Sequence, residues 1–151
     1  MISRFVLALV LSLSFSSLSY SQTQPTEIVD RFFEEYNKAG SDKAIEYYFG
    51  NNKYFAEISA GLTEVKQQLT SFLNVSGKFA GYELLTKKYA GPNILMLTYI
   101  VKFERLPATF RFSFYRPNDK WQVQNFKFDT RIFEELEEAS RIPVLNQEHH
   151  Q

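Results

Sequence analysis

The sequence of 151 residues contains no cysteine and only two histidines, His149 and His150, which stand near its end. Disulfide bonds are therefore excluded, and hydrophobic packing must supply the stability of the fold. A zinc site needs three or four convergent ligands, and the sequence offers no such cluster. We therefore expect no metal and no cofactor, and we expect no catalytic or metal-binding role for His149 and His150.

An excess of charge of either sign is also lacking. Seventeen Lys and Arg residues balance seventeen Asp and Glu residues, so the formal net charge is zero. Proteins that bind nucleic acid present a basic field to the phosphates, and this composition provides none. We therefore expect no nucleic-acid partner, and we expect the acidic run at 134–138 to be a solvated helix face.

Long hydrophobic runs are absent except near the start of the chain. Arg4 precedes an apolar run from Phe5 to Leu13, which is shorter than the ~20 residues that cross a bilayer. Ser19 and Ser21 place small residues before a cleavage site. The pattern predicts a secretory signal peptide over residues 1–21, removed after Ser21, and an exported periplasmic or extracellular chain without a membrane anchor. The alternative is an N-terminal anchor that stays attached.

Aromatic residues are abundant, at 17% of the chain. In the first half they join other apolar residues at helical spacing, in three segments that begin near Thr26, Ser41 and Gly61. From Tyr82 the period changes from 3.6 to 2, which is the period of strands. The sequence therefore predicts three helices followed by four strands, which we place at 82–89, 94–104, 110–115 and 121–128.

Two details of the strands carry structural information. Residues 94–104 are apolar at both alternating sets of positions, which is typical of a central strand covered on two sides. In the last strand Val123 is out of phase with Phe126. An extra residue near Gln124 and Asn125 would return both to one face, so we predict a β-bulge there.

This order of elements predicts an α+β fold, because helices segregated to one side of an antiparallel sheet form that class. We expect three N-terminal helices packed on a strongly curved antiparallel sheet, forming a cone, and a short C-terminal helix after Asp129. We expect one domain over residues 22–142. Pro143 is expected to end the last helix, which leaves a loose tail over residues 143–151.

Three segments carry a resemblance to a known family: FGNNKYF at 49–55, GYELLTKKY at 81–89 and FYRPNDKWQVQNFKFD at 114–129. The element order, together with the ending DKWQVQNFKFD at 119–129 after a hairpin turn, makes residues 26–130 resemble the nuclear transport factor 2-like superfamily, which has a cystatin-like cone fold. More narrowly, the three segments resemble small secreted bacterial proteins of this fold that have no assigned activity. The superfamily includes ketosteroid isomerases, dehydratases, polyketide cyclases, transport factors and binding domains, so the fold alone names no function.

The resemblance implies where a catalytic site would lie. Isomerases and dehydratases of this fold place a carboxylate or histidine in the cone beside a tyrosine or a second acid, because proton abstraction needs a base and an oxyanion needs a donor. The weak candidates here are Tyr36 as donor and Glu83 or Glu104 as base. Both carboxylates lie near strand ends, where solvated charges are common, so we expect ordinary surface positions for them.

An apolar cavity in the cone would be lined by aromatic side chains. Core packing is the alternative role for most of them, because large aromatic residues are usually buried. The candidates for a ligand pocket are Tyr36, Tyr48, Tyr99, Phe112 and Trp121.

The opposite face of the sheet is predicted to be mixed polar and aromatic, with Lys127 or Tyr99 as further candidates beside its main members. Such a face is a common dimer interface in proteins of this fold, and aromatic residues and arginine favour interfaces. A solvated face is the alternative. Arg111 either faces solvent there or anchors an anionic ligand. The main members are Arg111, Ser113, Tyr115 and Gln122.

The sequence favours a non-enzymatic exported domain that binds a small apolar ligand or a protein partner, through the cone or the sheet face. One alternative is a lyase or isomerase resembling ketosteroid isomerase, which would use a tyrosine and a carboxylate in the cone. Another is a homodimeric interaction module. Each of these functions requires a different set of side chains to meet in space.

Overall fold

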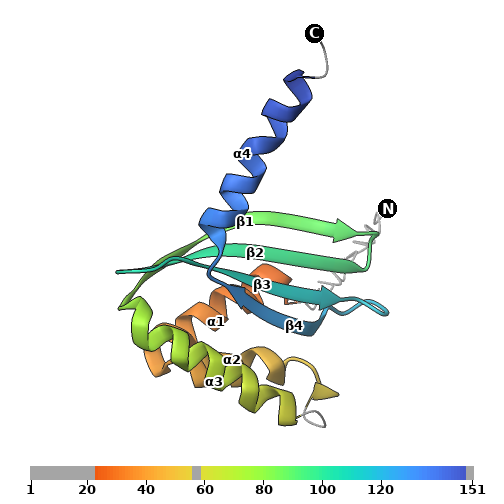
Figure 1. The fold of residues 1–151 in the computed structure, drawn as a ribbon. Helices are drawn as coiled ribbons and strands as arrows, with labels where there is room; N and C mark the ends of the chain where they lie inside the picture. Colours follow the sequence, from red (N-terminus) through yellow and green to blue (C-terminus); the bar gives the residue numbers. More distant parts are fainter. Residues whose placement is uncertain (1–22, 56–58, 149–151) are drawn as a thin grey trace, which may run out of the picture.

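A computed structural model of the chain describes residues 23–55 and 59–148. Figure 1 shows three helices below a four-stranded sheet and a fourth helix that leaves the sheet on its other side. The α+β class and the predicted order of elements are confirmed. The predicted signal peptide and His149 and His150 lie outside the described residues. The helices are α1 (Pro25–Ala39), α2 (Ser41–Gly50), α3 (Ser59–Ser76) and α4 (Ile132–Glu148), and the strands are β1 (Phe79–Ala90), β2 (Ile94–Phe103), β3 (Ala108–Tyr115) and β4 (Gln122–Asp129).

Helix α1 begins at Pro25, close to the start near Thr26 that the sequence predicts. Pro25 takes the first helical position, where its missing N–H costs nothing, and Gln24 is the N-cap. The Glu27 carboxylate accepts a hydrogen bond from the Gln24 backbone amide at 2.9 Å, which completes a capping box. The start of the helix is thus fixed by the cap. The apolar stripe of α1, which includes Val29 and Phe32, is buried against the sheet.

The sheet is a simple antiparallel meander in the order β1-β2-β3-β4. Strand β4 carries the bulge that the phase break predicts, because Ser113 pairs with Asn125 whereas Phe114 pairs with Val123, so the register passes over Gln124. The extra residue turns both Val123 and Phe126 toward the helices, and both are buried. The predicted bulge is therefore confirmed.

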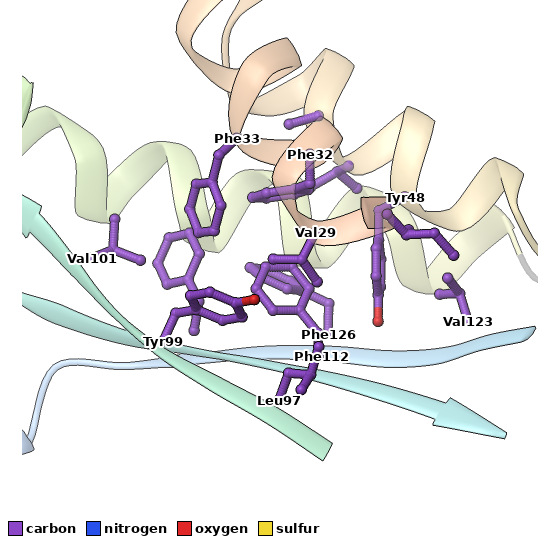
Figure 2. Packing of buried hydrophobic residues seen from close by; sticks show 14 of the residues in the cluster. Val29, Phe32, Phe33, Tyr48, Leu97, Tyr99, Val101, Phe112, Val123 and Phe126 are labelled. Carbon is purple, nitrogen blue, oxygen red and sulfur yellow. The ribbon is translucent and has the colours of Figure 1, made fainter. Parts of the chain in front are cut away.

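The core lies between α1, α2 and the inner face of the sheet, and it is largely aromatic (Figure 2). The Phe32 ring lies 5.1 Å from the Phe112 ring and 5.5 Å from the Phe126 ring, measured between centroids. The Phe33 ring stacks on Tyr82 at 3.9 Å with the planes 12° apart. Edge and offset contacts of this kind add to the burial of apolar area. The high aromatic content of the sequence is thus accounted for by packing between layers.

Strand β2 differs from its prediction in one respect. Its inward residues, among them Leu95 and Leu97, are buried as expected for a central strand. On the other face Met96 and Ile100 stay partly exposed, and Ile94 is 49% exposed. The two-sided cover expected from the sequence is therefore wrong for the single chain, because α1–α3 pack against only one face of the sheet (Figure 1).

Helix α4 extends past the residue that was expected to end it. It continues through Pro143 to Glu148, so the predicted end of the helix at Pro143 is wrong. Proline removes one hydrogen bond, but its fixed φ of about −65° is close to the helical value, so a helix can continue with a local distortion. None of the helices in the described ranges has the length and apolarity that crossing a bilayer requires.

Candidate functional site

Three of the five predicted pocket residues lie in the packed core. Tyr48 and Phe112 have no exposed surface, and Tyr99 is 4% exposed. The rings of Tyr48 and Tyr99 both pack against the ring of Phe112, with centroid distances of 5.2 Å and 5.8 Å (Figure 2). The alternative outward position for Tyr99 is therefore wrong, because its ring points toward α1.

Tyr48 has a structural task at the bulge. Its hydroxyl donates to the backbone carbonyl oxygen of Asn125 at 3.0 Å and lies 3.3 Å from that of Ser113. Burial raises the pKa of this hydroxyl well above its usual value, so the group stays protonated and remains a donor. A second anchor lies nearby, where the Asn52 side chain donates to the Val123 carbonyl oxygen at 2.6 Å. The end of α2 therefore fixes the irregular part of β4.

The other two predicted pocket residues lie at opposite ends of the sheet. Tyr36 packs against Phe79 at 5.1 Å, where β1 begins, and burial raises its pKa to about 12. Trp121 lies just before β4, and the guanidinium of Arg116 sits 4.8 Å from its ring centroid. Because they are separated by the length of the sheet, Tyr36 and Trp121 do not form one pocket with the core aromatics.

The two candidate carboxylates are not brought to Tyr36. Glu83 pairs with Lys102, and both side chains are largely exposed. Glu104 accepts a hydrogen bond from the backbone amide of Lys78 at 3.3 Å and is exposed. Within the described residues no hydrogen bond joins Tyr36 to either carboxylate. The catalytic arrangement that the resemblance implied therefore gains no support from these side chains.

A carboxylate does meet a tyrosine at the edge of α1, which the sequence analysis missed. The Tyr82 hydroxyl donates to Asp30 at 3.1 Å, and its ring is the one stacked on Phe33. Burial and then the charge of Asp30 raise the pKa of Tyr99 to about 12. Asp30 itself is exposed. Because 52 residues separate Asp30 from Tyr82, no local motif could reveal this pair.

A groove of about 390 Å³ lies between α3 and β4. Its volume is within the range of small-molecule sites, although such sites are mostly apolar. This groove has a mixed lining, in which three apolar residues stand among four polar or charged ones. The lining residues are Glu64, Val65, Gln68, Asn125, Phe126, Lys127 and Phe128.

The outer sheet face, which we define as the side of the sheet away from α1–α3, carries the predicted Arg111, Ser113, Tyr115, Gln122 and Lys127. The register supports this placement, because Arg111 pairs with Lys127 and Tyr115 with Gln122 in positions that alternate with the buried phenylalanines. The same alternation places the exposed or partly exposed apolar residues of β2 on this face. The outer sheet face therefore includes Glu83, Thr86, Lys88, Ile94, Met96, Thr98, Ile100, Lys102, Arg111, Ser113, Tyr115, Gln122 and Lys127, with Glu83 ion-paired to Lys102.

Arg111 is occupied by carboxylates of its own chain. One guanidinium nitrogen lies 2.8 Å from Glu135 at the start of α4, and another lies 3.7 Å from Asp129. Hydrogen bonds from Arg131 and the charge of Arg111 lower the pKa of Asp129 to about 2. Arg111 thus holds the base of α4 on the outer sheet face, a role that neither alternative in the sequence analysis anticipated.

Neither a metal-binding cluster nor similarity to a known protein identifies the functional site. In the ranges 23–55 and 59–148, no group of three or more His, Cys, Asp or Glu residues could hold a metal ion. Comparisons with family models, with curated proteins and with solved structures found no match to this chain. The function must therefore be inferred from the geometry of the chain itself.

Proposed function

We propose that this chain is an exported, non-enzymatic binding domain of the nuclear transport factor 2-like type that engages a protein partner through the outer sheet face. The observation that carries this proposal is the apolar surface left on β2. Ile94, Met96 and Ile100 are exposed or partly exposed in the middle and at one end of the sheet, beside the exposed ring of Tyr115. Contiguous apolar surface next to aromatic and basic residues is typical of protein interfaces.

The packing of the interior supports the non-enzymatic assignment. A catalytic cone needs a base and a donor at one cavity. Here the hydroxyl of the most buried tyrosine, Tyr48, donates to a backbone carbonyl oxygen. Glu83 and Glu104 are exposed, and they interact with Lys102 and with the Lys78 backbone amide. The interior groups thus serve the fold, and the outer sheet face remains available for binding.

Site-specific photo-crosslinking tests this proposal. A photoreactive phenylalanine analogue would replace Tyr115 on the outer sheet face, in cells that produce the chain. Tyr54, which is 56% exposed beyond the end of α2, is the matched control position. We expect protein adducts from Tyr115 and few from Tyr54. Equal yields at the two positions, or no adduct at Tyr115, would reject the proposal.

Binding of a small apolar ligand is a second candidate, for which the groove between α3 and β4 offers the volume and three apolar lining residues. A fluorescent fatty-acid analogue is a suitable probe, because its emission rises in an apolar site. Val65→Glu would place a charge in the lining, whereas Val75→Glu changes an exposed position of α3 outside it. This candidate requires saturable binding that Val65→Glu abolishes and Val75→Glu preserves. Absence of saturable binding to the unchanged chain would exclude it.

A further inference from the structure

Helix α4 presents two large apolar side chains, Phe133 and Leu136, that nothing in the described chain covers. Ile132 is 8% exposed, but Phe133 and Leu136 are 68% and 60% exposed. Together with Ala139 these residues form one arc of the helix, because positions three, four and seven apart share a side. An exposed arc with two large apolar side chains indicates a contact that a single chain does not complete.

The outer sheet face lacks a cover in the same way. Strand β2 has the two-sided apolar pattern of a central strand, yet on its outer side Thr98 is buried while Met96, Ile100 and Ile94 are partly exposed or exposed. Helix α4 leaves this face rather than lying down on it, on the side opposite α1–α3 (Figure 1). A protein that packs on the outer sheet face would therefore also contact α4.

The free charges of the two surfaces are complementary. On α4, Glu134 and Glu138 are exposed and lie one turn apart. Neither forms an ion pair within the described part of the chain, although the charge of Glu134 acts on Arg131 at the base of the helix. On the outer sheet face Lys88 in β1 and Lys127 in β4 likewise have no carboxylate partner among the described residues. Opposite charges placed around apolar surfaces favour specific pairing and fix its register.

We infer that the partner of the outer sheet face is a second copy of this chain, and that α4 of each copy packs on the outer sheet face of the other. This inference rests on the proposed function and names its partner. One chain carries both surfaces, so a two-fold axis satisfies the two contacts at once and closes the assembly as a dimer.

The dimensions of the two surfaces agree with this contact. Helix α4 has 17 residues and is about 25 Å long at 1.5 Å per residue. The sheet has four strands and is about 14 Å wide between its outer strands at ~4.8 Å spacing. One helix can therefore span the sheet. Leu136 and Phe133 would then meet Met96 and Ile100, with Glu134 and Glu138 near Lys88 or Lys127.

A charge-exchange experiment tests the pairing. One variant carries Glu134→Lys and Glu138→Lys, and the other carries Lys88→Glu and Lys127→Glu. Each variant alone places like charges at both contacts of the dimer, whereas a mixture of the two restores opposite charges at both. Light scattering of the full chain should give twice the mass of one chain for the unchanged protein, one chain for each variant and two chains for the mixture.

Helix variants test the apolar part of the contact. Leu136→Glu should weaken pairing at least about tenfold, whereas Val75→Glu, the same kind of change on an exposed site of α3, should leave pairing unchanged. Circular dichroism of both variants should match the unchanged chain, which separates lost pairing from lost folding. A dimer that survives Leu136→Glu, or a mixture of charge variants that stays monomeric, overturns the inference.

The identity of the crosslinked product separates this inference from the proposed function. With the photoreactive residue at Tyr115, mass spectrometry of a tryptic digest should find the α4 peptide 132–141 from a second copy. Isotope-labelled and unlabelled chains mixed before irradiation show that the link is between copies. Adducts with a different protein alone overturn the second copy as partner and keep the proposed function. No adduct above the Tyr54 level overturns both.

Discussion

The hydroxyl of Tyr48 lies 3.0 Å from the backbone carbonyl oxygen of Asn125, and this contact joins α2 to the bulge of β4. A bulge leaves backbone groups outside the regular ladder, and a buried carbonyl without a donor is costly. Tyr48 supplies that donor from inside the aromatic core. The phase of β4, and with it the burial of Val123 and Phe126, therefore depends on a side chain 77 residues away.

Tyr48→Phe tests this dependence. The substitution keeps the ring in the core but removes the donor from the Asn125 carbonyl, so we expect a loss of about 1–3 kcal/mol in the free energy of unfolding. Tyr54→Phe removes an exposed hydroxyl and should change stability by less than about 0.5 kcal/mol. Urea unfolding of both variants makes the comparison. Equal losses would show that the hydroxyl of Tyr48 does not support the bulge.

Phe112→Ala distinguishes a packed ring from a pocket wall. The ring lies between Phe32, Tyr48 and Phe126 with centroid separations of 5.1–5.3 Å. Removing a ring packed on all sides should cost about 3–5 kcal/mol, because it loses burial and leaves a cavity. Thermal or urea unfolding measures the loss. A cost below about 1 kcal/mol would indicate that Phe112 borders open space, as the pocket prediction requires.

Asp129 should make the fold sensitive to acid. Its pKa is lowered from 3.8 to about 2, first by hydrogen bonds from Arg131 and then by the charge of Arg111. The folded state thus favours the charged carboxylate, so its stabilisation is complete above pH 3.8 and is lost as the pH falls toward 2. Asp129→Asn should remove this part of the pH dependence. Asp119→Asn, in the turn between β3 and β4, should retain it.

Urea midpoints measured from neutral pH down to about 2 follow this effect. The unchanged chain and Asp119→Asn should lose stability in parallel, and Asp129→Asn should show a flatter profile below pH 3.8. Parallel profiles for all three proteins would mean that the contacts of Asp129 with Arg131 and Arg111 do not hold in solution.

The sequence predicted the fold where the signal was periodic. The change of period near Tyr82 separated helices from strands, and the phase break between Val123 and Phe126 located the bulge. The contacts that organise the site were not predictable in this way. Arg111 meets Glu135 across 24 residues, and Tyr82 meets Asp30 across 52. Such pairs depend on how elements pack, which local pattern does not encode.

The predicted cover on both sides of β2 was wrong, but the sequence pattern behind that prediction is informative. The two apolar sets of β2 indicated cover on both sides, and the single chain covers one. Pro143 misled for a simpler reason, because it marks a probable helix boundary while its ring is still compatible with helical φ. The uncovered side of β2 and the extended α4 together led to the inferred pairing.

Oxidation of Met96 tests the central claim, that a second copy covers the outer sheet face. The sequence has two methionines, Met1 and Met96, and Met96 is partly exposed in the middle of this face. Peroxide converts an accessible thioether to its sulfoxide, which mass spectrometry of the peptide quantifies. We predict that oxidation of Met96 slows at least about tenfold as the concentration rises through the range of dimer formation.

In Leu136→Glu the oxidation of Met96 should be fast at every concentration, whereas Val75→Glu should behave like the unchanged chain. An oxidation rate of Met96 that is the same at all concentrations and in all three proteins would contradict the account.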